Sequence, residues 1–382
     1  MDNSLVLNLD WLAFSVRLIP SPREKDNHGF VLNVDDAERQ GFRVLVLGGT
    51  NIYACRAVIY YRGAKCMTVL WQPFSRVIPF DSMLCEVANE FLYGRYVSLN
   101  GVEFHGLLWA LELVGVLHPC QFLCLSRVDL ACDFQLSPAR AGFVRKLAAN
   151  EIYVQRASEG SMFHVFDVRD NTVSRWPKQI SWGSKRSNIK WKLYNKSLEV
   201  FEYVNEGGRQ VRHCNKPYIV ERWCEAGFDD SNVWRLEVSI TPLAKYVHRG
   251  RGVQFRDMSN WFFLEDLFGC LYETKFVCRL NQGHKDRSND KQVWLLGKFS
   301  DAVKVKPKET LDSRGSSAYI SGLRAAMKQR SLPEVQGNTA LLELWTGAAI
   351  DCVLIGNLQD YFLHTYGVTI DHINEITEVC VD

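Results

Sequence analysis

A period-two alternation of apolar and polar residues runs through much of the first 250 or so residues and is typical of half-buried strands. The segments that have this pattern, or a short β-branched and aromatic run, are residues 5–16, 42–47, 52–61, 124–134, 163–167, 179–182, 189–194 and 233–240. The Gly48-Gly49-Thr50-Asn51 stretch between the second and third segments has the turn chemistry of a hairpin. This part of the chain therefore predicts a sheet.

Helical signals are fewer. Asp81 is a suitable N-cap for a helix over 81–93, and Ser137 for a helix over 138–149. A longer helix is expected over 258–280. Because strands precede helices along the chain, the pattern predicts an α+β fold. A domain built on an antiparallel sheet with flanking helices is followed by a smaller, mostly helical C-terminal region.

Length and composition exclude several classes of protein. The 382 residues are 47% hydrophobic, and the most apolar window, 107–125, contains Glu112, His118 and Pro119. A bilayer-spanning helix does not tolerate three such residues, and the N-terminus lacks the basic n-region of a secretory signal. We therefore expect a soluble, cytoplasmic protein with no membrane partner.

The net charge of +2 conceals segments of opposite sign. Residues 175–251 hold 15 Lys and Arg against 8 Asp and Glu, residues 275–330 hold 13 against 5, and residues 331–382 hold 8 acids and no Lys or Arg. Basic segments with interspersed tryptophans suit a nucleic acid, although a solvated basic face is the alternative. We expect a sheet domain over 1–255, a basic helical DNA-binding region over 256–330 and an acidic segment after it.

The predicted strand 124–134 carries two carboxylates on one face. Asp129 and Asp133 are four residues apart, so they point to the same side, while apolar residues occupy the other side. Burial of two carboxylates is costly unless each is paired with a cation. One interpretation is two structural ion pairs, with Arg127 or Arg235 as the partner. The other is a metal-binding or catalytic role.

The predicted strand 233–240 repeats this arrangement, with Arg235 and Glu237 on one face. On its own, an Arg-x-Glu pattern is more typical of a cross-strand ion pair than of a site. Together with Asp129 and Asp133, Glu237 gives three carboxylates, and carboxylate oxygens are ligands that Mg²⁺ and Mn²⁺ prefer. We predict that the three face a common pocket on neighbouring strands and bind one of these cations.

Residues 180–196 combine a basic, hydroxyl-rich turn, able to bind phosphate, with a strand. Lysines share one face of that strand with Tyr194. Neighbouring lysines favour the phenolate form of a tyrosine, so Tyr194 is a candidate nucleophile, and an ordinary strand tyrosine is the alternative. The residues that we expect to contact DNA are Ser184, Lys185, Arg186, Ser187, Lys190, Lys192 and Arg235.

Three motifs in this order resemble the replication initiation factor family. They are Val-Asp-Leu-Ala-Cys-Asp-Phe at 128–134, Trp-Gly-Ser-Lys-Arg-Ser followed by Lys-Leu-Tyr-Asn-Lys-Ser-Leu-Glu within 182–199, and Trp-Arg-Leu-Glu-Val at 234–238. The segment 10–16 also resembles that family's first strand, and the similarity covers about residues 8–245. The family comprises rolling-circle initiators of plasmids and filamentous phages, and related relaxases of conjugative elements.

The resemblance implies a nicking–joining enzyme. In such an enzyme a tyrosine attacks one DNA strand, keeps the 5′-phosphate covalently and leaves a free 3′-OH that primes synthesis. The family's nucleophile maps to Tyr194, and its metal-binding acids map to Asp129 and Glu237. Lys196 is expected to stabilise the phenolate or the departing 3′-oxygen. The expected partners are single-stranded or supercoiled origin DNA, a host helicase and a second copy of the chain.

Two other functions stay open from the sequence. One is a DNA-binding factor that keeps the fold without the chemistry, and the other is a metal-dependent nuclease that uses water and forms no covalent intermediate. Within the favoured reaction, Tyr203, Tyr218 and Tyr246 are the rival nucleophiles.

Overall fold

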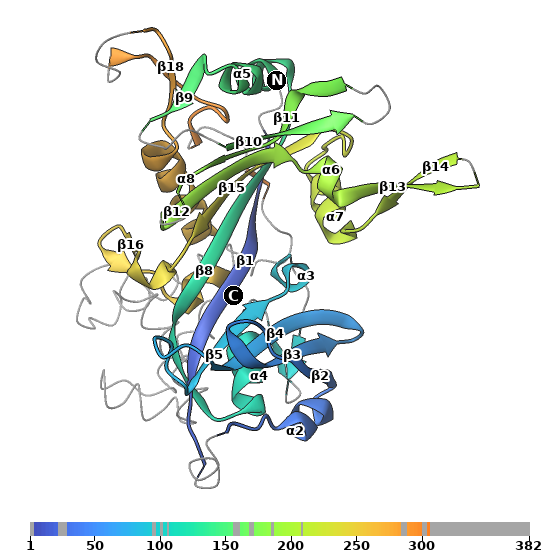
Figure 1. Cartoon of the computed structure of the whole chain (residues 1–382), viewed down its shortest axis with the longest axis vertical. Helices are drawn as coiled ribbons and strands as arrows, with labels where there is room; N and C mark the ends of the chain where they lie inside the picture. The colour runs from blue at the N-terminus through green and yellow to red at the C-terminus, as the bar shows by residue number, and fades with distance from the viewer. Residues whose placement is uncertain are drawn as a thin grey trace, which may run out of the picture. The chain divides into compact units, whose positions relative to one another are not determined.

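The computed structural model describes residues 4–21, 29–93, 97–99, 102–104, 107–155, 161–167, 172–184, 187–207, 209–283, 289–299 and 304–305. Within them the chain has an α+β fold built on one large, mainly antiparallel sheet (Figure 1). Its strands follow the order β10–β11–β12–β15–β8–β1–β5–β4–β3–β2, and β20 pairs with β1 in parallel. Their bounds are β1 Leu5–Leu18, β2 Phe42–Gly48, β3 Tyr53–Tyr61, β4 Ala64–Pro73, β5 Ser82–Val87, β8 Cys120–Gln135, β10 Ser161–Asp167, β11 Thr172–Trp182, β12 Ile189–Asn195, β15 Val233–Ile240 and β20 Lys304–Val305.

Helices and small sheets surround this large sheet. The helices are α2 Val34–Arg39, α3 Asn89–Leu92, α4 Leu108–Leu117, α5 Pro138–Ala148, α6 Ser197–Val200, α7 Pro217–Glu225 and α8 Trp261–Lys275, with 3₁₀ turns η1 Leu243–Lys245 and η2 Phe255–Ser259. The small sheets are β6 Val97–Leu99 with β7 Val102–Phe104, β13 Phe201–Glu206 with β14 Arg209–Cys214, β16 Val247–His248 with β17 Arg251–Gly252, and β9 Ile152–Val154 with β18 Cys278–Leu280 and β19 Gln292–Val293. Among the described residues, no helix is long and apolar enough to cross a membrane.

The two longest strands, β1 and β8, lie at the centre of the sheet and pair with each other along their length (Figure 1). They connect the half that contains β5, β4, β3 and β2 to the half that contains β15, β12, β11 and β10. A register shift between Leu9 and Trp11 leaves Asp10 outside the ladder with β8. Such an irregularity bends a strand and redirects a side chain.

The second half of the sheet has one apolar and one polar face. Trp182 and Trp191 belong to the apolar face, where their rings pack against Phe276, with centroids 5.1 and 4.9 Å apart. Trp191 also packs against Phe268 of α8 at 5.9 Å. Because side chains alternate along each strand, Lys192 and Tyr194 of β12 point to the opposite face. The aromatic core under α8 therefore fixes which residues face the other way.

Most predicted strands are confirmed, as is the helix over 138–149. The Ser137 hydroxyl accepts a hydrogen bond from the backbone N–H of Arg140 at 3.4 Å, as expected for an N-cap. The helix expected over 81–93 is wrong. Residues Ser82–Val87 form strand β5, which pairs with β1 and β4 on its two sides, and only the four residues of α3 are helical. The buried, alternating Met83, Cys85 and Val87 explain the difference, because a central strand satisfies every backbone group through its neighbours.

The C-terminal part of the described chain also differs from expectation. The helix expected over 258–280 ends at Lys275, and Cys278–Leu280 pairs with β9 instead. α8 belongs to the same hydrophobic core as the large sheet, so the boundary expected at residue 255 falls inside this core. The acidic segment 331–382 lies outside the described residues.

A buried arginine joins three strands of the sheet. Arg235 on β15 has no exposed surface, and its Nε donates to Asp133 Oδ1 at 2.5 Å while Nη2 donates to Asp133 Oδ2 at 2.8 Å. Its Nη1 donates to Asp10 Oδ1 at 2.5 Å, and Nη2 also donates to the hydroxyl of Tyr93 at 2.9 Å. Trp223 of α7 donates to Asp133 Oδ2 at 2.8 Å. β1, β8 and β15 are therefore held together by one guanidinium.

Substitution of Arg235 should be among the most destabilising changes in the protein. Arg235→Met leaves the carboxylates of Asp133 and Asp10 buried without their cation, so the free energy of unfolding should fall by about 3–5 kcal/mol. Arg17→Met is the matched control, because it breaks only an exposed ion pair with Asp81. It should change the free energy of unfolding by less than about 1 kcal/mol.

Chemical denaturation of both variants measures the difference. Adding Asp133→Asn to Arg235→Met should recover part of the loss, because one of the two orphaned charges disappears. Equal effects of Arg235→Met and Arg17→Met would contradict this role.

Candidate functional site

Strand register brings the predicted site residues to one face of the sheet. Tyr194 lies opposite Arg235, and Lys192 lies opposite Glu237, on the paired strands β12 and β15. On the other side of β15, Asp133 lies opposite Arg235. The prediction that the strands with Asp129, Asp133 and Glu237 are neighbours in one antiparallel sheet is confirmed, because β8 pairs with β15.

The hydroxyl of Tyr194 lies between a carboxylate and an ammonium group. It donates to Glu237 Oε2 at 3.0 Å, and it accepts a hydrogen bond from Lys196 Nζ at 3.3 Å. The other oxygen of Glu237, Oε1, accepts from Lys192 Nζ at 3.0 Å. Tyr194 is only 9% exposed and Lys196 only 1%. The tyrosine oxygen is therefore held by two side chains in a place with little competing water.

The surroundings of Tyr194 favour its protonated form. Burial raises the pKa of Tyr194 well above its ordinary value, and the charge of Glu237 raises it further, while Arg235 acts in the opposite direction. The expectation that neighbouring lysines favour the phenolate is therefore wrong for the free protein, because burial and the carboxylate across the strand outweigh them. A reaction at this oxygen has to remove the proton, and Glu237 is the group that already accepts its hydrogen bond.

Asp129 and Asp133 have different partners. Asp129 accepts two hydrogen bonds from Arg127, from Nε at 2.9 Å and from Nη2 at 2.5 Å. Asp133 is bound by Arg235 and Trp223. The ion-pair interpretation of the two aspartates thus describes both of them in the free protein. Burial raises the pKa of Asp129, Arg127 lowers it, and the nearby charge of Glu237 raises it again.

The carboxylates of Asp129 and Glu237 on β8 and β15 fit a hard divalent cation only in part. The charge of Glu237 raises the pKa of Asp129. Each carboxylate forms an ion pair with a cation whose side chain is more than a third exposed, Arg127 at 37% and Lys192 at 39%. Within the part of the chain that the structure describes, no three acidic, histidine or cysteine side chains are grouped as a metal site. Two carboxylates suit Mg²⁺ or Mn²⁺, which fill their remaining positions with water and substrate phosphate. Asp133 already accepts hydrogen bonds from Arg235 and Trp223, so it is not among the proposed ligands.

The residues expected to contact DNA lie in different surroundings. Ser184 and Lys190 are exposed on or beside the β11–β12 turn, where Gly183 has a φ of +108°. The hydroxyl of Ser187 donates to the carbonyl of Ile189 at 2.6 Å. Lys185 and Arg186 lie outside the described residues. Arg235 is completely buried, so in this structure it offers no surface to a phosphate and serves the ion pair instead.

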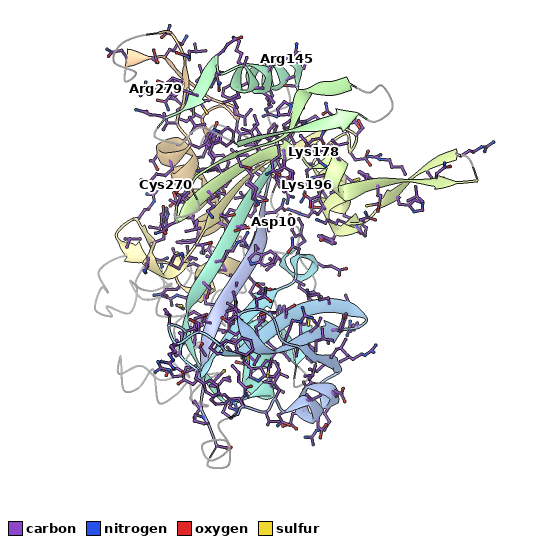
Figure 2. All side chains as sticks on the ribbon, in the orientation of Figure 1. Asp10, Arg145, Lys178, Lys196, Cys270 and Arg279 are labelled. Carbon is purple, nitrogen blue, oxygen red and sulfur yellow. The ribbon has the colours of Figure 1, made fainter. Side chains whose placement is uncertain are left out.

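Several residues of this site were not predicted from the sequence. Asp10 and Tyr93 bind Arg235, and Glu199 binds Lys196 Nζ through Oε1 at 2.8 Å. Figure 2 labels Asp10 on β1 and Lys196 after β12, and the charge of Asp10 acts on Lys196. A signal for Asp10 was present, because it follows the same alternation as Asn8 within an apolar strand. Tyr93 had no such signal, because nothing in its local sequence points to a partner on β15.

The ionisation of Tyr194 can be tested directly. We expect the phenol to stay protonated beyond pH 10 in the free protein, because burial and Glu237 disfavour its anion. Glu237→Gln removes that negative charge and should lower the pKa of Tyr194. Carbon-13 NMR of ring-labelled tyrosine measures both titrations, with Tyr194→Phe to assign the signal. A Tyr194 signal that titrates below pH 10 in the unaltered protein would contradict the description.

Comparison with known proteins gives matches among solved structures and none among family models or curated sequences. Among solved structures, the chain is similar to a rolling-circle replication initiator protein from Geobacillus stearothermophilus. The two are 13% identical, the TM-score is 0.44, and the match covers 79% of this chain and 99% of that chain. This distant similarity assigns no residue and no activity to the present chain.

Proposed function

We propose that this chain nicks and rejoins one strand of DNA through a covalent bond to Tyr194. The observation that carries the proposal is the position of the Tyr194 hydroxyl, 3.0 Å from a carboxylate oxygen of Glu237 and 3.3 Å from the Nζ of Lys196. A nucleophile, a proton acceptor and a cation are thus joined by hydrogen bonds, which is the arrangement that activates a hydroxyl for attack. The motifs shared with the replication initiation factor family favour a phosphodiester as the target.

The proposed step forms one bond to phosphorus and breaks another. The Tyr194 oxygen attacks the scissile phosphorus in line, its proton moves to Glu237, and a phosphotyrosine bond forms to the 5′-phosphate side. The bond from phosphorus to the 3′-oxygen breaks, the electron pair leaves with that oxygen, and the oxygen takes a proton from solvent. Lys196 stabilises negative charge on the tyrosine oxygen as its proton leaves. Joining is the same step in reverse.

Asp129 and the Glu237 oxygen that does not accept the Tyr194 proton would hold Mg²⁺ or Mn²⁺ in this proposal. When bound, such a cation polarises the non-bridging phosphate oxygens and offsets the charge that builds on them. Arg127 and Lys192 neutralise these carboxylates in the free protein, and in this proposal their partly exposed side chains turn towards the phosphates of an incoming strand. The exchange keeps the site close to neutral in both states.

The substrate that we propose is origin DNA, single-stranded or supercoiled, in rolling-circle replication or mobilisation of a plasmid, phage or integrative element. The exposed Ser184 and Lys190 mark the side from which the strand approaches, and they contact the backbone rather than bases. Ser187 and Lys192 continue this path towards Tyr194. A host helicase and a second copy of the chain belong to the same proposal as partners.

Tyr194→Phe is the decisive substitution for this proposal. It removes one buried oxygen, so it should keep the fold and DNA binding while it abolishes both cleavage and the covalent adduct, a loss of at least about a thousandfold in rate. The protein is mixed with single-stranded origin oligonucleotide and Mn²⁺, and a denaturing gel resolves free DNA, cleaved DNA and the slower protein–DNA band.

Tyr218→Phe and Tyr246→Phe are the controls, and both should retain the slower band. Cleavage without a slower band in the unaltered protein indicates a metal-dependent nuclease, and DNA binding without cleavage indicates a non-catalytic factor. A slower band that persists in Tyr194→Phe overturns the assignment of the nucleophile.

A further inference from the structure

Lys196 is a buried lysine whose surroundings disfavour its charged form. It is 1% exposed, and burial lowers the pKa of its ammonium group, with Arg235 lowering it further. Its backbone is fixed on both sides, since its N–H donates to the carbonyl of Val233 at 2.9 Å and its carbonyl accepts from the N–H of Glu199 at 3.0 Å. The backbone from which the ammonium group extends is therefore fixed where β12 ends and α6 starts.

Glu199 opposes this loss of charge. Its Oε1 accepts from Lys196 Nζ at 2.8 Å and also from Lys216 Nζ, so one carboxylate oxygen lies between two ammonium groups. These contacts lower the pKa of Glu199 to about 2 despite its burial, so Glu199 is an anion at neutral pH. Lys216 precedes α7, so the trio also connects α6 to α7.

The other charged groups around Lys196 do not replace Glu199. Asp10 on β1 raises the pKa of Lys196, but Asp10 is already bound by Nη1 of Arg235. Lys216 lowers the pKa of Lys196, and Glu237 is directed to Tyr194 and Lys192. Among the described residues, Glu199 is the carboxylate that forms an ion pair with the Lys196 ammonium group, at 2.8 Å.

We propose that Glu199 is a positioning residue that keeps Lys196 protonated and aimed at the Tyr194 oxygen. The inference rests on the proposed nicking function, in which that ammonium group offsets charge on the tyrosine oxygen. Glu199 acts through Lys196 and touches neither DNA nor the reacting atoms. The Lys-Ser-Leu-Glu segment at 196–199 thus supplies the cation and its support within one short turn.

The pH profile of nicking tests this role. Glu199→Gln removes one contacting charge, so the loss of rate on the alkaline side, where Lys196 loses its proton, should move about one pH unit or more towards acid. Glu199→Asp keeps the charge and should restore the profile even where the rate is lower. Glu225→Gln is the matched control, because Glu225 forms an ion pair of the same spacing with Arg222 on α7 and should leave the profile unchanged. Thermal unfolding establishes that each variant is folded.

A direct titration separates this inference from the proposed function. Carbon-13 NMR of labelled lysine, with Lys196→Gln to assign the signal, should show Lys196 losing its proton at lower pH in Glu199→Gln than in the unaltered protein. An unchanged Lys196 titration, or an unchanged pH profile in a protein that nicks, overturns the role of Glu199 while Tyr194 stands. A shifted titration in a protein that does not nick supports the electrostatic role and overturns the reaction.

Discussion

The contact between Arg235 and two carboxylates is the interaction on which the rest of the site depends. A guanidinium with no exposed surface binds Asp133 on β8 and Asp10 on β1, and it lies on β15 directly opposite Tyr194. Burial of these charges is tolerable only while all three are present and hydrogen-bonded, because a single missing partner leaves a desolvated ion. The register of the central strands, and with it the position of Tyr194, is therefore set by one network.

Each carboxylate at the site contacts at least one cation. Asp129 is matched by Arg127, Glu237 by Lys192, and Glu199 by Lys196 together with Lys216. Low dielectric strengthens these contacts and penalises any group left alone. In the function that we propose, a phosphate or a divalent cation enters by exchange with Arg127 or Lys192, which avoids an uncompensated charge. Burial and the charge of Glu237 keep Tyr194 protonated in the free protein, because both raise its pKa.

The sequence predicted the elements of this site better than their pairing. Alternation placed Asp129 and Asp133 on one face and Arg235 and Glu237 on another strand's polar face, as found. It could not supply the register, and register decides that Asp133 lies opposite Arg235. The lysines beside Tyr194 suggested a phenolate because they are near in sequence, whereas Glu237 is 43 positions away and forms the closer contact.

Other differences between sequence and structure also arise from long-range contacts. The strand β5 has buried side chains and two neighbours, and neither is visible in a local pattern that also fits a helix. Asp10 and Arg235 are 225 positions apart. Such contacts follow from tertiary packing, which overrides local propensity.

Mapping the covalent bond to DNA in the unaltered protein tests directly whether Tyr194 is the nucleophile. The protein is allowed to react with origin oligonucleotide and Mn²⁺, the DNA is digested to the attached nucleotide, and peptides are sequenced by mass spectrometry. If Tyr194 is the nucleophile, the nucleotide is attached to the peptide that contains Tyr194 and to no other tyrosine. A nucleotide on Tyr218 or Tyr246, or cleaved DNA with every tyrosine unmodified, would contradict this assignment.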